Sequence, residues 1–439
     1  MSGLAHALLS RGFPVSGSDS SDSTTVAKLR QAGAAVTVGH SAANLNGAQL
    51  VVRTTAVPDD NPEMVAARAA GLPIYHRSEL LAWMCRGHRA IAITGTHGKS
   101  TTTAMAATVF AHAGVDPTVF VGAEAPLLGG NYHIGSGPHV IFEACESDGS
   151  FLRYEGCSQV ISSIEPDHLD QHGTWERLLA AFQGFAAIAD PAGFVVYNSD
   201  YETVHSIASA SPAKPISYGL ETPADLQARD VRHGPDRTAF QFVCRGSAVA
   251  QVSLPVLGDH NVLNALGALG CALGSGLDLS EACAALAEYR PVGRRFQPIA
   301  TVRGVRIIDD YAHHPTEVRA TLHTARAAGD GRIIAVFQPH LRSRTRDLLT
   351  EFGGAFADAD IVVLTGIYQP RADGLEDFHV SRLYDEVRRN EPDKQLLLIE
   401  DKDDVAGQLL PLVQEGDMVI TIGAGDVYKV AHQLADGLE

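Results

Sequence analysis

Short apolar runs alternate with amphipathic segments along the chain, a pattern that predicts strands separated by helices. Within residues 1–87, a helix at 2–11 precedes a strand at 13–17, and the alternation continues to a helix at 78–85. Repetition of this kind favours a parallel sheet. The pattern opens inside a helix, so we expect the N-terminal unit to be truncated, without the strand and glycine-rich loop that begin a dinucleotide-type fold.

The alternation resumes in two further units. Residues 88–290 combine buried strands, a short antiparallel set over 215–257 and two closing helices, and the following Pro-Val-Gly run is typical of a linker. Residues 291–439 return to regular strand and helix alternation. We therefore predict an α/β chain of three domains. They are a Rossmann-like N-terminal domain (1–87), a central P-loop-type ATPase domain with a parallel sheet and a small antiparallel sheet (88–290), and a Rossmann-like C-terminal domain (291–439).

Composition narrows the classes of partner. With 34 basic and 51 acidic residues the formal net charge is −17, which argues against nucleic acid or an anionic membrane as partner. No apolar run approaches the roughly 20 residues of a membrane span. The six cysteines form no CxxC pair and are typical of reduced thiols in the cytoplasm.

The most informative segment lies at residues 95–101, between a strand-like run and an alanine-rich helical stretch. It reads Gly95-Thr96-His97-Gly98-Lys99-Ser100-Thr101. A glycine-rich turn that opens a helix cradles phosphate, with the lysine on the β- and γ-phosphates and the hydroxyl on Mg²⁺. Only two residues separate these glycines, where the usual P-loop has four, so we predict a distinct subtype of nucleotide loop. The alternative is an ordinary turn with an exposed lysine.

Acidic and histidine side chains follow two further strands. Glu143 ends one apolar strand and is followed by Glu146-Ser147-Asp148, while His168 lies in a Glu-Pro-Asp-His sequence after the next. Ligands of parallel sheets gather at these strand ends, so Glu143 is a candidate Mg²⁺ ligand. Imidazole is an unusual ligand for Mg²⁺, and His168 alone is more typical of a surface loop.

Three more segments carry candidate ligand contacts. Asn261 and Asn264 share one helical face and could contact an adenine edge, or could serve only capping and core polar contacts. Arg295, in Arg-Arg-Phe after the linker, suits bidentate phosphate binding, although linker arginines are often simply solvated. Two strand-end segments in the third unit, at 309–315 and 337–346, are rich in His, Asp and Arg.

Taken together, these residues resemble the Mur ligases. The resemblance rests on Gly-Thr-His-Gly-Lys-Ser at 95–100, the acidic groups at 143–148, Asp-His at 167–168, His-Asn-Val-Leu-Asn-Ala at 260–265, Arg-Arg-Phe at 294–296 and Asp-Tyr at 310–311. It covers essentially the whole chain. His97, the run Asp-Asp-Tyr-Ala-His-His-Pro at 309–315 and Phe-Gln-Pro-His at 337–340 are most similar to the alanine-adding branch of that family.

The resemblance implies an ATP-dependent amide ligase of peptidoglycan synthesis. Its substrates would be UDP-N-acetylmuramate and L-alanine, with ATP and Mg²⁺ as cofactors. The muramoyl carboxylate would attack the γ-phosphate of ATP, and the amine of L-alanine would then attack the resulting acyl phosphate. We expect a cytoplasmic monomer or weak homodimer without nucleic acid or membrane insertion.

The resemblance also assigns residues. The catalytic group would be Lys99, Glu143, His168 and Arg295, with Ser100, Glu143 and His168 as metal ligands. Besides the loop at 95–101, the nucleotide would meet Asn261 and Asn264 at adenine, Arg295 at the phosphates and Asp310 at the ribose. The substrate-binding residues would be Asp19, Thr54, Thr55 and Arg77 for the UDP-sugar, Asn131 for its muramoyl part, and His313, His340 and Arg344 for alanine and the reacting carboxylate.

Three alternatives remain open at this point. The first is the related ligase that adds a recycled tripeptide to UDP-N-acetylmuramate. The second is a nucleotide-binding protein whose ligation is impaired because the N-terminal glycine-rich loop is missing. The third is a nicotinamide dehydrogenase, which the absence of any GxGxxG sequence disfavours.

Overall fold

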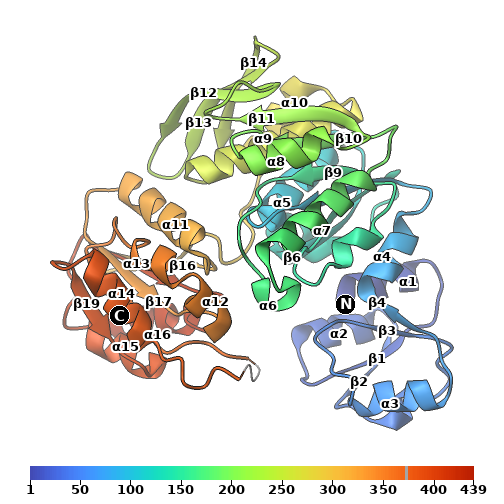
Figure 1. The fold of residues 1–439 in the computed structure, drawn as a ribbon, viewed down its shortest axis with the longest axis horizontal. Coiled ribbons are helices and arrows are strands. Elements are labelled where there is room, and N and C mark those ends of the chain that lie inside the picture. The colour runs from blue at the N-terminus through green and yellow to red at the C-terminus, as the bar shows by residue number, and fades with distance from the viewer. Residues whose placement is uncertain (371–373) are drawn as a thin grey trace.

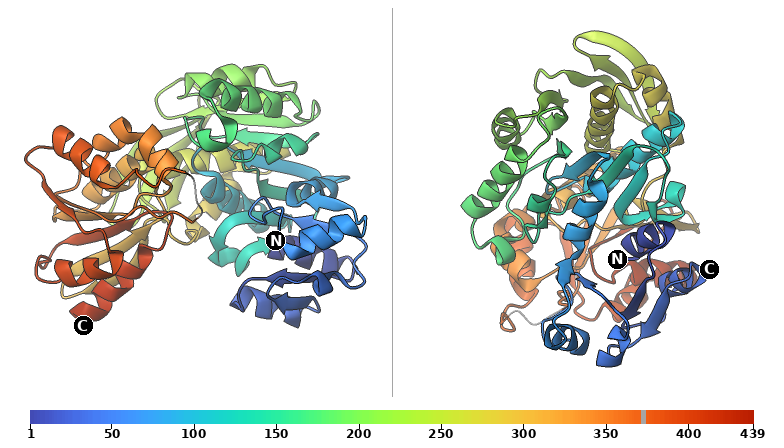
Figure 2. Two further views of the ribbon diagram at one scale, coloured as in Figure 1. Left: turned by 60° about the horizontal axis from the view of Figure 1, so that its bottom comes forward. Right: turned by 90° about the vertical axis from the view of Figure 1, so that its right-hand side faces the viewer.

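The strands of the computed structural model fall into three regions along the chain, and the model describes residues 1–370 and 374–439 (Figure 1). We call residues 1–87, 88–290 and 291–439 the N-terminal, central and C-terminal regions. In Figure 1 the central region forms the upper part of the molecule, with the C-terminal region at lower left and the N-terminal region at lower right. The left view of Figure 2 also shows the C-terminal and N-terminal regions on opposite sides of the molecule. No helix in the described part of the chain is both long enough and apolar enough to cross a membrane.

The N-terminal region contains parallel strands, as predicted, but they form two separate pairs rather than one sheet. The strands have only three or four residues and none is buried, so little apolar surface favours their lateral association. The predicted strand at 13–17 begins three residues later, after Pro14, which has no N–H for a ladder. The elements are α1 (Ser2–Ser10), β1 (Ser16–Asp19), α2 (Thr24–Gln31), β2 (Ala35–Val38), β3 (Val51–Arg53), α3 (Pro62–Ala69), β4 (Ile74–His76) and α4 (Arg77–Cys85).

The central region contains one ten-stranded sheet in the order β14-β13-β12-β11-β10-β9-β5-β8-β6-β7. The antiparallel strands β12–β14 continue the parallel part, because β11 pairs in parallel with both β10 and β12. The strands are β5 (Arg89–Thr94), β6 (Thr118–Ala125), β7 (Gly130–His133), β8 (His139–Glu143), β9 (Ser158–Ile161), β10 (Phe194–Asn198), β11 (Lys214–Gly219), β12 (Leu226–His233), β13 (Thr238–Cys244) and β14 (Ser247–Leu254).

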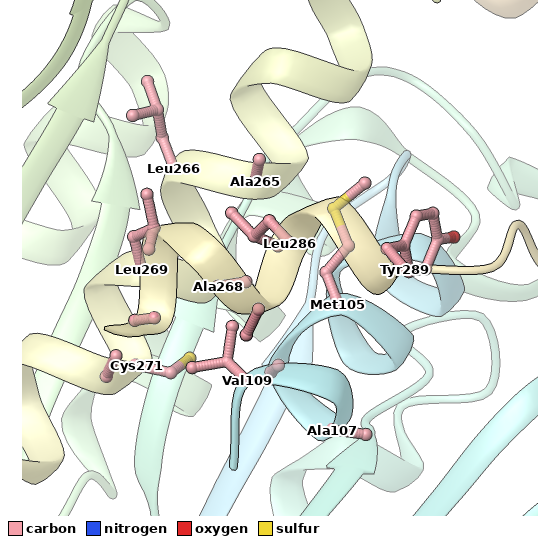
Figure 3. Close-up of a cluster of buried hydrophobic side chains, with 14 of the residues drawn as sticks. Met105, Ala107, Val109, Ala265, Leu266, Ala268, Leu269, Cys271, Leu286 and Tyr289 are labelled. Carbon is pink, nitrogen blue, oxygen red and sulfur yellow. The ribbon is translucent and has the colours of Figure 1, made fainter. Parts of the chain in front are cut away.

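Helices cover both faces of this sheet. On one face α5 and α9 pack together through Met105, Val109 and Leu269, joined by Leu286 (Figure 3). The other face carries α4, α7 and α8, together with Leu4 of α1. The helices are α5 (Lys99–His112), α6 (Leu169–His172), α7 (Trp175–Ala187), α8 (Glu202–Ser209), α9 (Asp259–Ser275) and α10 (Leu279–Ala285).

The first helix, α1, rests on the central sheet. A Cβ atom at Gly3 would lie 2.9 Å from Tyr132 Cβ on β7, so the absence of a side chain allows this close approach. The His6 ring stacks on Tyr132 with the ring centroids 4.9 Å apart. The chain therefore begins against the central region before it enters the N-terminal strands.

The C-terminal region contains a six-stranded sheet in the order β15-β16-β20-β17-β18-β19, parallel except for β15. Its two faces carry separate buried apolar clusters, as a parallel sheet covered by helices on both faces requires. The strands are β15 (Gln297–Val302), β16 (Val305–Asp310), β17 (Ile333–Phe337), β18 (Ile361–Leu364), β19 (Gln395–Leu398) and β20 (Met418–Ile422). The helices are α11 (Pro315–Ala327), α12 (Arg342–Asp347), α13 (Leu349–Gly353), α14 (Ser381–Asn390), α15 (Lys402–Leu409) and α16 (Tyr428–Leu438).

Candidate active site at the phosphate loop

The loop at 95–98 connects the buried strand β5 to the N-terminus of α5, as the sequence predicts. Gly95 and Gly98 have φ values of +136° and +80°, in the left-handed range that favours glycine. A Cβ atom at Gly98 would lie 2.2 Å from Asn264 Oδ1, so no other residue fits there without displacing Asn264. The glycines hold the loop so that the first N–H groups of α5 remain available for an anion.

Lys99 folds back over this loop. Its Nζ donates to the carbonyl oxygens of Gly95 and Thr96, at 2.5 and 3.1 Å, and to Glu146 Oε1 at 2.9 Å. Burial lowers the pKa of Lys99, but the nearby Glu146 carboxylate more than reverses this and raises the pKa above its ordinary value. The ammonium group therefore stays charged beside the phosphate cradle.

Oxygen donors gather beside Lys99. The Ser100 hydroxyl donates to Glu143 Oε2 at 2.6 Å, and the same oxygen accepts the Gly122 N–H at 2.9 Å. Glu146 Oε2 is buried without a hydrogen-bond partner, although such atoms in proteins are almost always satisfied. Hard oxygen ligands and an unsatisfied carboxylate fit a magnesium ion at this place.

His168 lies at the edge of the same cluster. Its Nε2 is 3.7 Å from Glu146 Oε1 and 3.6 Å from Asp167 Oδ2. Its backbone is left-handed, with φ of +54°, and its N–H donates to Asp167 Oδ1 at 2.7 Å. Strained backbone of this kind clusters at functional sites. The structure therefore places His168 beside Glu146 and Asp167, and its role as a metal ligand stays a prediction.

Residues 163–165, which follow β9, support the phosphate loop through hydrogen bonds. The N–H of Thr96 donates to Ser163 O at 2.9 Å, and the N–H of His97 donates to Ser163 Oγ at 2.9 Å. The Thr96 hydroxyl accepts the N–H of Glu165 at 2.8 Å. The sequence predicts a strand up to residue 164, but β9 ends at Ile161 because the following residues bond to the loop instead.

The C-terminal region reaches this segment through a buried ion pair. Arg344 Nε donates to Asp167 Oδ1 at 2.8 Å, and both side chains are less than 10% exposed. Arg344 also lies 3.1 Å from His340 Nδ1, and the His340 ring is 5.9 Å from that of His313. His313, His340 and Arg344 are thus together, as predicted, and the ion pair joins them to the phosphate loop.

His97 makes a second connection between the regions. Its Nδ1 lies 3.1 Å from Glu317 Oε1 on α11, and its Nε2 lies 3.5 Å from Glu165 Oε2. Burial lowers the pKa of His97, but these two carboxylates outweigh it and raise the pKa to about 9. The third residue of the loop, His97, is therefore bound to the C-terminal region rather than exposed.

Asn261 and Asn264 share one face of α9, as predicted. Asn264 Nδ2 donates to Asn261 Oδ1 at 3.2 Å, and Asn264 Oδ1 accepts the Thr102 hydroxyl at 3.2 Å. Asn261 Nδ2 donates to Leu257 O at 2.7 Å. These amides hold α9 against the first turn of α5, and their contact with adenine stays a prediction.

Arg295 and Asp310 lie close to each other at the start of the C-terminal region. The Arg295 guanidinium lies over the Tyr311 ring, 4.9 Å from its centroid. Both carboxylate oxygens of Asp310 accept backbone N–H groups, from Phe296 and Ala312, at 2.7 Å. Burial raises the pKa of Asp310 to about 6, against the opposing effect of Arg295. Ribose contact by Asp310 stays a prediction.

The predicted UDP-sugar residues are not among the hydrogen-bond partners of the Lys99 ammonium group. Thr55 donates to Asp148 Oδ2 at 2.6 Å across to the central region, and Thr54 Oγ1 accepts the N–H of Ala56. Asp19 ends β1 and accepts the N–H of Ser21. Arg77 begins α4 and Asn131 lies on β7, and no hydrogen bond in the described part of the chain joins any two of these five residues.

Sequence reasoning assigned no role to several charged groups of this site. Glu146 and Asp167 follow the ends of predicted strands, and this position is a sequence signal for a ligand contact. Glu317 is the third residue of α11 in a capping box with His314, so its sequence context indicates only a helix start. Nothing in the sequence alone indicated that Glu165 would face α11.

Comparisons with known proteins agree with this arrangement. Residues 1–89 match the Mur ligase family catalytic domain, residues 93–272 the Mur ligase middle domain, and residues 294–425 the Mur ligase glutamate ligase domain. The UDP-N-acetylmuramate–L-alanine ligase of Symbiobacterium thermophilum is 41% identical over 447 residues, covering 100% of this chain and 92% of the relative. The ligase of the same name from Paenarthrobacter aurescens is 41% identical, covering 100% and 94%.

Solved structures give the same result. The crystal structure of the UDP-N-acetylmuramate–alanine ligase of Thermotoga maritima superposes with a TM-score of 0.83 at 30% identity, covering 100% of this chain and 96% of that one. A murein peptide ligase from Psychrobacter arcticus superposes with a TM-score of 0.72 at 23% identity, and this similarity concerns the fold alone. The chain belongs to the Mur ligase family.

Proposed function

We propose that this chain is an ATP-dependent ligase that joins L-alanine to UDP-N-acetylmuramate, the first peptide-adding step of peptidoglycan synthesis. The observation that carries the proposal is identity of about 40% over the full chain with ligases of that name. The similarity to murein peptide ligases is weaker, at 23% identity for the full-length structure. A nicotinamide dehydrogenase would leave the Gly-Lys-Ser loop unexplained.

The reaction has two chemical steps. A muramoyl carboxylate oxygen bonds to the γ-phosphorus of ATP and ADP leaves, which produces an acyl phosphate. The alanine nitrogen then bonds to the carbonyl carbon, loses a proton, and expels inorganic phosphate. Charge builds up on the transferring phosphoryl group, so the fixed ammonium of Lys99 suits its stabilisation.

We propose Ser100 and Glu143 as ligands of one Mg²⁺ and His168 as a ligand of a second. When bound, Mg²⁺ would neutralise phosphate charge during phosphoryl transfer. The unsatisfied Glu146 Oε2 supports metal binding at this place. Glu146 also orients Lys99 through its other oxygen.

We assign the remaining contacts by region. The cluster of His313, His340 and Arg344 suits the carboxylate of alanine, since arginine and imidazole N–H groups donate to carboxylates. Arg295 suits the phosphates, Asp310 the ribose, and Asn261 with Asn264 the adenine. The residues proposed for the UDP-sugar are Asp19, Thr54, Thr55, Arg77 and Asn131.

We also propose that the reaction takes place in the cytoplasm. All six cysteine thiols are free, and four of them are buried. Free thiols are typical of proteins in a reducing compartment. ATP as the phosphoryl donor is consistent with this location.

The test is phosphate release from ATP, Mg²⁺ and UDP-N-acetylmuramate, measured with and without L-alanine, with the product identified by mass spectrometry. We expect release to depend on both substrates and the product to gain one alanine residue. Preference for the tripeptide over L-alanine would favour the recycling ligase. Nucleotide binding without release under any condition would favour the protein with impaired ligation.

A further inference from the structure

Three potential metal ligands converge between the phosphate loop and α11. They are His97, Glu165 and His314, whose ligand atoms all lie within 4.8 Å of one another. Glu165 Oε2 is 3.5 Å from His97 Nε2 and 3.7 Å from His314 Nδ1. A tetrahedral metal with ligand distances of about 2.0–2.1 Å separates its ligand atoms by roughly 3.3 Å. Two of the three separations are already close to this value.

Hydrogen bonds orient both imidazoles toward a common point. His97 Nδ1 lies 3.1 Å from Glu317 Oε1, so it donates its hydrogen to that carboxylate and turns Nε2 toward Glu165. His97 Nε2 is buried and has no hydrogen-bond partner. His314 Nε2 lies 3.2 Å from Pro166 O, so it donates there and turns Nδ1 toward Glu165.

These outer contacts are those that metal-bound histidines usually make. A ligating histidine commonly donates its other ring N–H to a carboxylate or a backbone carbonyl. His97 has the carboxylate and His314 has the carbonyl. Glu165 Oε2 also accepts the Thr316 hydroxyl at 2.6 Å, which fixes the third ligand. A metal would have to displace the proton that the raised pKa of His97 keeps on Nε2. It would also replace the N–H of Thr316, which makes a long bond of 3.3 Å to His314 Nδ1.

We propose that His97, Glu165 and His314 bind a divalent transition metal of the Zn²⁺ class, distinct from the Mg²⁺ site at Ser100 and Glu143. Two imidazoles and one carboxylate suit Zn²⁺, Co²⁺ or Ni²⁺, whereas Mg²⁺ requires mainly oxygen ligands. The two sites would therefore select different metals although His97 and Ser100 are only three residues apart in the sequence.

The proposed site joins two regions of the molecule. His97 belongs to the phosphate loop and Glu165 to its supporting segment, while His314 caps α11 in the C-terminal region. A metal held by all three fixes α11 against the loop. The fourth coordination position would be left to water or an added ligand.

The test is a Zn²⁺ titration of the full-length protein in saturating Mg²⁺ without nucleotide, with bound zinc measured by equilibrium dialysis and elemental analysis. The variants are His314→Asn, which retains a good helix-capping side chain, and Glu165→Gln, which retains the shape of the side chain. His323→Gln is the control, because His323 is an exposed histidine on the same helix. Circular dichroism establishes that all four proteins are folded.

We expect the wild type and His323→Gln to bind one equivalent of Zn²⁺ more than His314→Asn and Glu165→Gln. X-ray absorption of that equivalent should show two imidazole ligands. Glu317→Gln, which replaces the carboxylate that accepts from His97 Nδ1 with an uncharged amide, should weaken binding by about 10- to 100-fold. Equal zinc binding by all four proteins, or a bound zinc without imidazole scattering, would overturn the proposal. Because no nucleotide or substrate is used, the result is independent of ligase activity.

Discussion

In the proposed function, Lys99 is the residue on which we expect phosphoryl transfer to depend most. Its ammonium group is held by two carbonyl oxygens and Glu146, so it is charged and already positioned before a nucleotide binds. Preorganised charge of this kind contributes to catalysis because it need not reorganise during the reaction.

We expect Lys99→Ala to lower kcat for alanine-dependent phosphate release by about 10²- to 10³-fold, the usual loss when one preorganised donor is removed. The measurement is steady-state phosphate release at saturating substrates. The control is Lys214→Ala, which removes an exposed lysine of the same region and should leave kcat unchanged. Undiminished turnover by Lys99→Ala would refute the role assigned to this residue.

Asp310 gives the protein a pH-dependent stability. Its pKa of about 6 lies above the usual value, so between about pH 4 and 6 the folded protein keeps a proton that the unfolded chain has lost. The free energy of unfolding therefore falls as pH rises through this interval, by up to about 3 kcal/mol, and then stays level with respect to this group.

Asp310→Asn should lack this decline, because an amide does not ionise. The measurement is thermal unfolding of both proteins at pH 4 and at pH 6.5. The quantity compared is the change in the stability of each protein between the two pH values. Any constant loss from the altered hydrogen bonds cancels in that comparison. The control is Asp330→Asn, at an exposed position, which should follow the wild-type pH profile. If the Asp310 carboxyl had an ordinary pKa, Asp310→Asn would follow that profile as well.

At the level of elements, the junction of α5 with the phosphate loop depends on glycine. We expect Gly98→Ala to displace Asn264, break its bond with Thr102, and raise the KM for ATP by at least about tenfold, equivalent to 1.4 kcal/mol. The control is Gly114→Ala beyond the other end of α5, where φ is +71° but a Cβ atom would meet nothing within 4 Å. Gly114→Ala should lower stability yet leave the KM for ATP unchanged; an equal rise in both variants would mean that strain alone is responsible.

Elements with strong apolar patterns could be predicted from the sequence. The sequence predicts strands at 139–143, 361–364 and 418–422, and the structure has these bounds, because each is a mainly apolar segment that is almost fully buried. The phosphate loop was equally clear, since strand, glycines, lysine and helix follow one another. Local sequence determines these features.

Contacts between regions could not be predicted in the same way. The pairs Asp167–Arg344 and His97–Glu317 join residues 177 and 220 positions apart, and no periodicity relates them. The position of Asn264 against Gly98 likewise depends on how α9 packs on α5. Tertiary packing determines these contacts, so the sequence indicates candidate site residues but neither their partners nor charged groups such as Glu165 and Glu317.

At the scale of the whole molecule, the Asp167–Arg344 pair couples the C-terminal region to the phosphate loop. Removal of one partner leaves a buried charge without compensation, which typically costs 3–5 kcal/mol. We expect Asp167→Asn and Arg344→Gln each to lower kcat/KM for L-alanine by at least about 100-fold, equivalent to 2.7 kcal/mol.

The double variant should have a kcat/KM for L-alanine no lower than that of the less active single variant, because the two changes remove one shared interaction. The measurement is a double-mutant cycle on kcat/KM at saturating ATP. Arg326→Gln, which breaks an ion pair with Asp360 at the surface, is the control and should change little. Strictly additive losses would show that the two side chains act independently.

The segment at 163–168 connects the phosphate loop to the C-terminal region. On one side it bonds to Thr96 and His97, and on the other it meets His314, Thr316 and Arg344. The phosphate loop therefore has its full set of supports only while the C-terminal region is docked. If the C-terminal region moved away, this segment would lose its contacts with His314, Thr316 and Arg344, and we expect the phosphate loop to be less well ordered in that state.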